Sequence, residues 1–460
     1  MKTTGIKTSG MKLLTTICLL FSSLAGQAWS QNCQAPPSWF PPNQTPRPDD
    51  SANFNSNCKF HQWSWQMFLW LTQKTGPNGE LRFESFPSPQ DLFNSQGSKP
   101  ESFANRKAYR PLLLSARPLK ERPGSSLEEI NQAGSNGLLI DQNGRAVYYS
   151  QYINKTFYDF VRSKKYYDPT VYLSAPATEN FPISSMELKA SWKILASGEK
   201  FNGYSREAII NPLIEKDDKV VVDTSRTQKV NVGLVGLHVA GVVKNHPEFI
   251  WATFEHMENC PPLPSGTDPG SSDPVSDKNW LFYKAKTPAK ECNINNANVA
   301  VLTDPAKQIL APITQVYLRH LNGGGSASNQ ANIESLNKSV HSQLKKDSVW
   351  KNYYLGGAIW LFPNTLEPNS NLQGNITGST KLSNATMETF TQQESFRNNC
   401  FQCHNTQVKF PPSSASGVQP LPGKNLNISH ILVDGYFRTA SAKRQKEVRA
   451  LRAAIKKNNQ

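Results

Sequence analysis

The sequence is poor in charge and in long apolar runs. Only 18% of its 460 residues are Asp, Glu, Lys or Arg, and beyond residue 30 no apolar run reaches the roughly 20 residues of a membrane-spanning helix. The first 380 residues contain no nucleophile–base motif and no phosphate-binding glycine loop, and the chain has no internal repeat. These absences exclude a repeat array and a phosphate-loop enzyme, and they predict a chain with no transmembrane segment.

The first 30 residues have the pattern of a removable secretory signal peptide. Lys2, Lys7 and Lys12 precede the apolar run LLTTICLLFSSLA, which is too short to span a bilayer permanently, and AWS precedes Gln31 as a cleavage site. We therefore expect a mature chain that begins near residue 31 and is exported, into the periplasm if the host is bacterial. An exported chain folds in an oxidising compartment, where disulfides persist.

Aromatic residues are abundant, and positive charge exceeds negative charge. Ten Trp and 22 Phe argue against disorder, because such side chains are normally buried in a fold. The net charge is +15, and the C-terminal stretch AKRQKEVRALRAAIKKNNQ contains Glu447 as its single acidic residue. We expect a solvated basic helix there, and a docking surface for an acidic partner or an anionic membrane is the alternative. Nucleic acid is not an expected partner of an exported protein.

Four cysteines predict two disulfides. Apart from Cys18 in the signal peptide and a close pair near the C-terminus, they are Cys33, Cys58, Cys260 and Cys292, which allow three connectivities. Proximity in the sequence favours Cys33–Cys58 and Cys260–Cys292, although the pairing stays open. Closing loops of this size typically stabilises a fold by roughly 3 kcal/mol through the unfolded chain.

Residues 31–362 combine helix and strand patterns, and we expect a large α+β domain with antiparallel β-hairpins, which could divide into two subdomains. The apolar spacing over 58–72 predicts a buried helix. A hairpin signal opens 137–162, and 184–195 alternates as a strand does. The two β-rich runs of 230–257 flank KNHPE, which is typical of a polar turn.

The hairpin expected over 230–257 predicts that two histidines lie close together. If its two runs pair about KNHPE, the numbers of paired residues sum to roughly 492–494. His238 then lies opposite residues 254–256, so that His238 and His256 share a face of the sheet within one or two rungs. Two such imidazoles could hold a metal or line a cofactor pocket. The alternative is that each imidazole hydrogen-bonds a buried carbonyl.

The last part of the chain holds the most specific motif. Residues 363–384 contain no apolar cluster and are predicted to be a linker or surface loop, and 385–460 are predicted to form a small, mainly helical segment. We expect a helix to run into NNCFQCHN within this segment. Cys400 and Cys403 then share a helix face, and His404 follows them at once.

Four chemistries use two cysteines in this setting. A zinc site normally needs a second pair of ligands, and the sequence has no other close Cys/His pair. A thioredoxin-type dithiol follows a strand, and a plain disulfide leaves the adjacent histidine unexplained. Covalent haem c uses all three residues, because the two thiols attach the vinyl groups and the next histidine binds the iron. The motif therefore predicts one haem c, anchored by Cys400 and Cys403, with His404 as the proximal iron ligand.

The sequence resembles the c-type cytochromes, in particular a group of long, largely uncharacterised bacterial cytochrome c family proteins with one CxxCH near the C-terminus. The similarity lies in HQWSWQMFLWL, IDQNGRAVYYSQYIN, MELKASWKIL, GLHVAGVV, WATFEH, NATMETF and NNCFQCHN. These segments are scattered from residue 61 to residue 405. The resemblance implies the same haem anchors and proximal ligand in a cytochrome c-like C-terminal segment, and it implies no particular activity.

The downstream methionine that binds iron in small c-type cytochromes is absent here. All six methionines precede Cys400. His430 is the only histidine downstream and is the first candidate for the sixth ligand, with His238 and His256 as fallback candidates. Otherwise the iron is five-coordinate or is bound by water, Lys409 or another group. His430 would then cap or pack without binding iron.

The motif favours an exported mono-haem c-type cytochrome that passes single electrons to an unidentified redox partner, which could dock on the basic surface. Bis-histidine ligation would lower the reduction potential relative to His/Met ligation. Because an electron carrier needs only about a hundred residues, the large domain supports an alternative. That alternative is a haem-dependent oxidoreductase of the peroxidase or oxygenase type, with an open iron site facing the large domain. A second alternative is a sensor or binding protein with a structural haem. Whether the protein is an enzyme therefore stays open, and electron transfer ranks first on the motif alone.

Overall fold

The computed structural model forms one compact unit from Cys33 onwards. The residues that the structure describes are 1, 33–42, 44–93, 98–114, 137–217, 219–223, 225–392, 399–412, 415 and 417–458. The expected signal peptide, apart from Met1, lies outside these residues. Within them, no helix is both long enough and apolar enough to cross a membrane.

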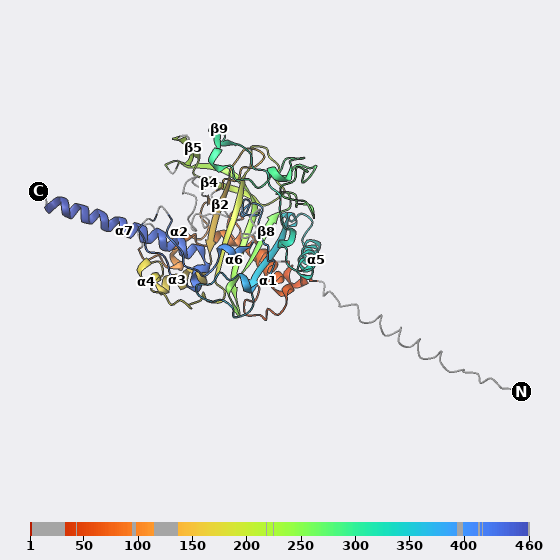
Figure 1. Ribbon diagram of the computed structural model, residues 1–460, viewed down its shortest axis with the longest axis horizontal. Coiled ribbons are helices and arrows are strands. Elements are labelled where there is room, and N and C mark those ends of the chain that lie inside the picture. Colours follow the sequence, from red (N-terminus) through yellow and green to blue (C-terminus); the bar gives the residue numbers. More distant parts are fainter. Residues whose placement is uncertain are drawn as a thin grey trace. The chain divides into compact units, whose positions relative to one another are not determined.

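An eight-stranded sheet forms the centre of this unit (Figure 1). Its strands are β1 (Leu113–Leu114), β2 (Val147–Ile153), β3 (Met186–Ile194), β4 (Ser205–Ile210), β7 (Gln228–Val243), β8 (His246–His256), β11 (Tyr353–Leu361) and β12 (Ile376–Gly378). The strand order is β1-β4-β7-β8-β11-β12, while β3 also pairs with β7 and β2 pairs with β3. Among the described strands of this sheet, β1 and β4 pair in parallel and all other pairs are antiparallel.

Helices and two small hairpins complete the described part of the unit, and the mixture confirms the predicted α+β class. The α-helices are α1 (Asn57–Leu71), α2 (Pro89–Leu92), α3 (Lys155–Lys164), α4 (Pro169–Leu173), α5 (Ala327–Gln343), α6 (Cys400–Cys403) and α7 (His430–Asn458). The hairpins are β5 (Leu213–Lys216) with β6 (Lys219–Val222), and β9 (Val301–Asp304) with β10 (Ile309–Ala311).

One face of the sheet is apolar and packs against α1 and α5. Leu237 and Val239 alternate along β7 and enter this core together with Phe254 of β8. Phe254 stacks on Phe68 of α1 with 4.2 Å between ring centroids, and it meets Trp65 at 5.1 Å. The helix predicted over 58–72 is therefore confirmed, and its aromatic side chains are the ones that hold it on the sheet.

The opposite face of the sheet packs against α3, α4 and α7. Ala240 of β7 and Trp251 of β8 share a core with Phe157 of α3, Tyr172 of α4 and Tyr436 of α7. Helix α7 therefore belongs to the same compact unit as the strands, rather than to a separate haem segment.

Residues 363–384, which we predicted to be a linker or surface loop, are mostly irregular and only partly buried, and they also contribute a short strand to the sheet. Strand β12 lies within this stretch and pairs with the end of β11, from Ile359↔Gly378 to Leu361↔Ile376. The strand is only three residues long, and the buried apolar side chains of this stretch, Leu372 and Leu382, are isolated in the sequence. Such short, scattered contributions produce no apolar cluster that a sequence pattern could reveal.

The hairpin of β7 and β8 differs from the predicted register. His238 pairs with Thr253, and the strands are joined by only two residues, Lys244 and Asn245. The φ angle of Asn245 is 64°, the left-handed conformation that tight hairpin turns require. Opposed residues share a face and faces alternate along a strand, so His256 points to the opposite face from His238. The prediction that these two histidines share a face was wrong.

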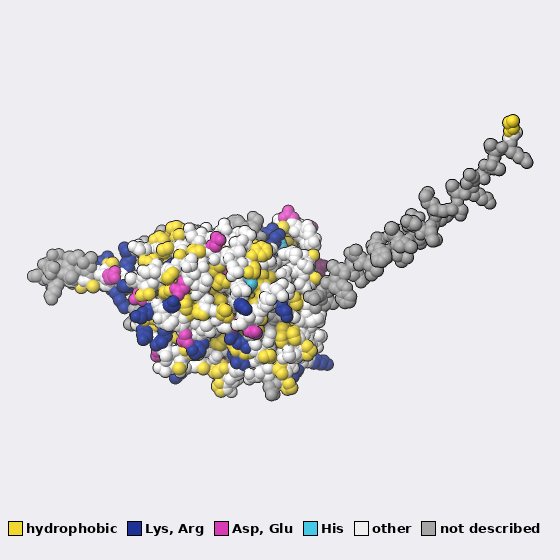
Figure 2. Space-filling model, turned by 90° about the horizontal axis from the view of Figure 1, so that it is seen from below, with side chains coloured by type: hydrophobic (Ala, Val, Ile, Leu, Met, Phe, Trp, Pro, Cys, Tyr) yellow, Lys and Arg dark blue, Asp and Glu magenta, His cyan; other side chains and the backbone are white. Residues whose placement is uncertain are grey.

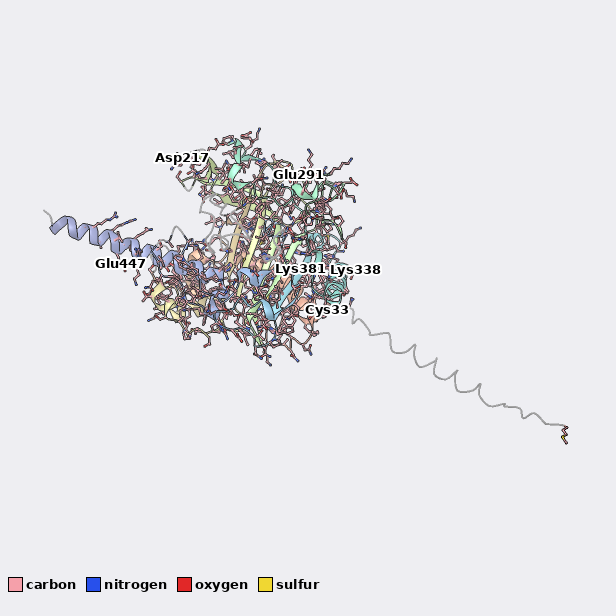
Figure 3. The ribbon with its side chains drawn as sticks, in the orientation of Figure 1. Cys33, Asp217, Glu291, Lys338, Lys381 and Glu447 are labelled. Carbon is pink, nitrogen blue, oxygen red and sulfur yellow. A yellow bond between two sulfur atoms is a disulfide. The ribbon has the colours of Figure 1, made fainter. Side chains whose placement is uncertain are left out.

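Only one of the two expected disulfides is present in the structure. Cys33 and Cys58 form a disulfide, which confirms that prediction, and Cys33 lies where the compact unit begins (Figure 3). Cys260 and Cys292 are not joined to each other. Their side chains enter two different apolar clusters, the second of which contains Tyr283, so the predicted second pairing is not observed.

Helix α7 carries the basic stretch near the C-terminus. Its residues 443–450 are exposed, and Glu447 lies on this part of the helix (Figure 3). Lys and Arg side chains gather at the end of the unit from which α7 extends (Figure 2). The expected basic C-terminal helix therefore forms, and its described basic side chains face solvent.

Candidate functional site

The CxxCH motif folds as a single helical turn, α6. The side chain of Asn399 caps the turn by accepting a backbone N–H at 3.1 Å, and the His404 amide donates to the Cys400 carbonyl at 2.8 Å. The helix expected before the motif is not seen over residues 384–392, which form turns, while residues 393–398 lie outside the described chain. Local capping, rather than a long helix, therefore orients the motif.

Both motif cysteines and His404 line one cavity between α6 and the sheet. This cavity contains about 860 Å³ of space between atoms, counting the part open to solvent. Side chains of the sheet such as Ala240 and Trp251 give it a mainly apolar wall. Concave sites with apolar walls and a few polar groups are typical of cofactor pockets.

The ring of His404 is held by three neighbours. Its Nδ1 lies 2.9 Å from the carbonyl oxygen of Ile428, and the rings of Trp251 and His430 lie 4.0 Å and 3.7 Å from its ring, centroid to centroid. Because a carbonyl only accepts, Nδ1 carries the proton and Nε2 keeps its lone pair. Burial lowers the pKa of His404 to about 3, so the ring is neutral at pH 7. A neutral, oriented imidazole is the form that binds a metal.

His430 lies directly beside His404 rather than across the cavity from it. Its ring stacks on that of His404, and its Nε2 donates to the Cys403 carbonyl at 3.0 Å. Two axial imidazoles approach iron from opposite faces of a porphyrin, which stacked rings do not do. Lys409 also bonds the motif, donating to Asn405 Oδ1 at 2.8 Å. The structure therefore presents neither His430 nor Lys409 in the position expected of a sixth ligand.

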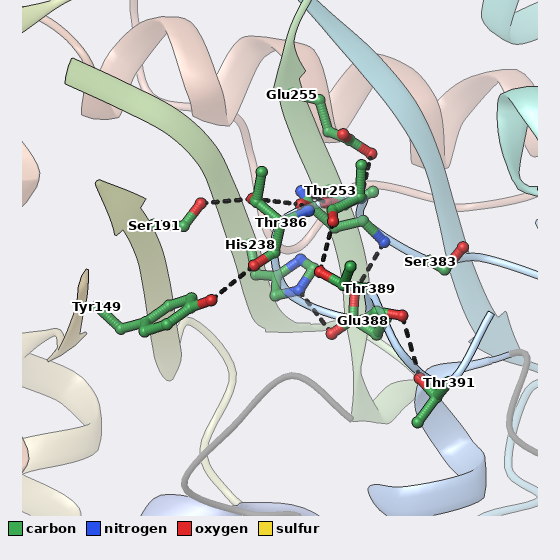
Figure 4. Close-up of polar contacts among 12 residues, drawn as sticks. Tyr149, Ser191, His238, Thr253, Glu255, Ser383, Thr386, Glu388, Thr389 and Thr391 are labelled. Carbon is green, nitrogen blue, oxygen red and sulfur yellow. Dashed lines mark hydrogen bonds and ion pairs between the residues drawn. The ribbon is translucent and has the colours of Figure 1, made fainter. Parts of the chain in front are cut away.

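The two fallback candidates, His238 and His256, lie on different faces of the sheet. His238 lines the cavity from β7, and its Nε2 lies 3.1 Å from Oε1 of Glu388 (Figure 4). His256 lies outside the cavity, on the other face of the sheet, where it stacks on Phe201 at 4.7 Å. Burial lowers the pKa of His256 to about 4. Only His238 is therefore placed to act at this site.

Residues 384–391, which carry Glu388, are hydrogen-bonded to the same sheet face as His238 (Figure 4). Nδ2 of Asn384 donates to Thr253 Oγ1 at 2.8 Å, and the next backbone N–H donates to Glu255 Oε1 at 3.1 Å. Burial acts to raise the pKa of Glu388, but His238 and a backbone N–H hold it below its usual value. This segment is therefore fixed on the sheet beside the cavity, with a carboxylate facing the imidazole.

Sequence reasoning missed Glu388, Glu187 and Lys189 as residues of this cavity. Glu187 and Lys189 alternate along β3 with apolar side chains, and they point to the cavity side of the sheet. Burial raises the pKa of Glu187 to about 7, although Ser429 donates to its carboxylate at 2.6 Å. The signal was present in MELKASWKI, where every second residue is polar, but it does not indicate what those polar residues face.

The donor set of this site suits haem c better than a bare metal ion. Among the residues that the structure describes, no group of three or more His, Cys, Asp or Glu side chains could hold such an ion. Haem c needs only two thiols and one imidazole from the protein. Cys400, Cys403 and His404 supply these on one cavity, with the Nε2 lone pair available. The residues present therefore fit a covalently attached haem.

No protein-family model, curated protein or solved structure matches the chain. The resemblance to c-type cytochromes therefore stays a prediction that rests on the quoted sequence segments.

Proposed function

We propose that the chain is an exported mono-haem c-type cytochrome that passes single electrons. Cys400 and Cys403 would hold one haem c through thioethers, and His404 would bind its iron through Nε2. One observation carries the proposal: the Ile428 carbonyl fixes the tautomer of His404 on a cavity that both thiols also line. When bound, haem c supplies one-electron redox chemistry.

The protein's part in this function is to position the imidazole and to exclude water. Trp251 and His430 pack on the His404 ring, so the ring cannot rotate without losing both contacts. The apolar wall that contains Ala240 would exclude water from one side of the cavity, whereas His238 and Glu388 lie on its polar side. The polarity and the solvent access of the surrounding are among the factors that set the potential of a haem.

The redox partner is proposed to be acidic where it docks. The exposed basic part of α7, residues 443–450, is a surface that would attract such a partner electrostatically. Export into the periplasm, where covalent haem attachment takes place in bacteria, is part of the same proposal and rests on the expected signal peptide.

Covalent haem retention tests the proposal. The full chain would be expressed together with a cytochrome c maturation system, and haem would be detected by its peroxidase stain on a denaturing gel. We expect the wild-type band to stain and the Cys400→Ser/Cys403→Ser band to lose the stain. Cys292→Ser is the matched control, because this cysteine lies outside the cavity, and it should keep the stain. An unstained wild-type band would overturn the proposal.

A haem-dependent oxidoreductase is the second candidate, and one observation favours it. His430 lies on the His404 side, while the His238–Glu388 pair lines the cavity from the sheet. An iron position open to this pair would bind CO. Low-spin iron that does not bind CO would support the electron carrier, whereas high-spin, CO-binding iron would support the oxidoreductase.

A further inference from the structure

One wall of the cavity carries a histidine–carboxylate pair that does not belong to the CxxCH motif. His238 projects from β7 between Lys189 of β3 and Thr253 of β8, which are its partners in the sheet. Its Nε2 lies 3.1 Å from Glu388, and both members of the pair line the cavity (Figure 4). The side chains of His238 and Glu388 are 19% and 26% exposed, so the pair is accessible from the cavity.

The hydrogen bonds define which nitrogen of His238 is available. Oε2 of Glu388 accepts the backbone N–H of Asn384 at 2.8 Å, which fixes the carboxylate, and Oε1 faces the imidazole. An ionised carboxylate only accepts, so Nε2 of His238 carries the proton. Nδ1 then keeps its lone pair and can accept a proton. A carboxylate that orients an imidazole in this way stabilises the protonated ring as well.

A second histidine–carboxylate pair in the chain, His246 with Glu248, is buried in the core and serves as a structural comparison. His246 Nδ1 lies 2.8 Å from Glu248, and both side chains are at most 2% exposed. The ring of His246 meets Phe60 edge-on at 4.9 Å in the apolar core, and neither His246 nor Glu248 lines the cavity of the motif. The His238–Glu388 pair differs from the His246–Glu248 pair because it lines the cavity that Cys400, Cys403 and His404 also line.

We infer that His238, oriented by Glu388, transfers protons to and from a small protic ligand, such as a hydroperoxide or hydrogen cyanide, that enters this cavity. The inference rests on the proposed haem site and concerns its other side. In the forward step the H–O or H–C bond of the ligand breaks, its proton moves to Nδ1 of His238, and the ligand binds as its anion. Glu388 is a positioning residue, because it acts through the imidazole. The other titratable groups on the cavity are Glu187, Lys189, His404, His430 and the motif cysteines.

Cyanide binding to the ferric haem protein tests the inference without any turnover. Hydrogen cyanide must lose its proton to bind, so His238→Gln should slow cyanide association by about 100-fold or more, the usual contribution of a general base. Glu388→Gln should slow it less, because the imidazole remains. His320→Leu is the matched control, since His320 is also partly buried but lies outside the cavity, and it should leave the rate unchanged.

The infrared spectrum of the ferrous CO complex provides a second readout. A hydrogen-bond donor near bound CO lowers the C–O stretching frequency, so His238→Gln and Glu388→Gln should each shift this band, whereas His320→Leu should not. An unchanged cyanide rate together with an unchanged CO band in His238→Gln would overturn the inference. A change from low-spin to high-spin iron in His238→Gln would also overturn it, because His238 would then be an iron ligand.

The two proposals fail in distinguishable ways. A wild-type protein that keeps no haem on a denaturing gel overturns the haem site, and the inference about His238 with it. A stained protein whose cyanide and CO readouts ignore His238 overturns the inference alone. If His238→Gln does not fold, the Glu388→Gln readouts decide, since Gln preserves the shape of that side chain.

Discussion

His404 and His430 each donate a side-chain hydrogen bond to a backbone carbonyl in the segment that carries the other. Their rings stack with 3.7 Å between centroids and 16° between planes. His404 donates to the Ile428 carbonyl, two residues before His430, while His430 donates to the Cys403 carbonyl, directly before His404. These reciprocal bonds fasten the CxxCH turn to the start of α7. His430 is therefore a support for His404, and its Nε2 is already used by the Cys403 carbonyl.

Replacing His430 should affect stability rather than iron coordination. His430→Ala removes one of three donors to the Cys403 carbonyl, which also accepts from the Asn405 N–H and from Lys409 Nζ. It also removes the stacked ring, and we expect the free energy of unfolding to fall by about 1–3 kcal/mol, mainly through the lost packing. His430→Phe keeps a stacking ring and should lose less. Denaturant unfolding measures both, and optical spectra should show the wild-type spin state in each variant. A loss of low-spin iron in both variants would identify His430 as a ligand instead.

Glu255 should make stability depend on pH. Burial raises the pKa of its carboxyl from 4.5 to about 8 in the folded protein. A raised folded-state pKa means that the stabilisation is fully present below the unfolded value and is lost as the pH rises through about 8. The contribution of Glu255 to the free energy of unfolding should therefore fall by roughly 1.4 kcal/mol per pH unit between about pH 5 and pH 8, which is measured as the difference from a variant that lacks this carboxyl.

The matched variant for this prediction is Glu255→Gln, which can still accept the Ala385 N–H that Glu255 accepts at 3.1 Å. Its unfolding free energy, measured by denaturant titration across the same range, should lack this slope. If wild type and variant show parallel pH profiles, Glu255 ionises in the fold without cost and the prediction is wrong.

Lys193 should be one of the most sensitive charged residues. Its Nζ lies 2.8 Å from Asp141 and 2.5 Å from Glu199, with Lys193 and Asp141 at most 1% exposed. Lys193→Met leaves a buried carboxylate unpaired and should cost about 3–5 kcal/mol of unfolding free energy. Lys229→Met removes an exposed pair with Glu207 and should cost about 0–1 kcal/mol. Equal effects in denaturant unfolding would contradict the assigned burial.

The Cys33–Cys58 disulfide should stabilise the N-terminal part of the fold. It joins the start of the compact unit to α1 across a sequence separation of 25 residues. Cys33→Ser/Cys58→Ser should lower the unfolding free energy by about 2–5 kcal/mol. A thiol reductant should lower that of the wild type similarly and leave the variant unchanged. A reductant effect of equal size in the variant would point to another bond.

Local sequence patterns predicted the helices and strands of this fold better than they predicted the register in which the strands pair. The aromatic spacing of residues 58–72 predicted α1, and the β-rich runs of 230–257 predicted β7 and β8. Their register could not be predicted, because a two-residue turn at Lys244 and Asn245 replaced a longer one, and a short shift moved His256 to the other face. An odd shift reverses the face of every side chain on a strand.

The part of the candidate site that lies in one short sequence motif could be predicted from the spacing of its residues. CxxCH indicates Cys400, Cys403 and His404 without knowledge of the fold. Glu388 could not be found in this way, because it meets His238 only through long-range packing of residues 384–391 on the sheet. The role of His430 depends equally on a contact with His404 that no sequence pattern encodes.

The mass of the mature protein tests the central claim most directly. The full chain would be produced with a cytochrome c maturation system, alongside a known c-type cytochrome as a positive control, and measured by mass spectrometry under denaturing conditions. The account predicts a polypeptide that carries the mass of one haem in the wild type and none in Cys400→Ser/Cys403→Ser. A wild-type mass equal to that of the polypeptide alone, while the control cytochrome carries its haem, would contradict it.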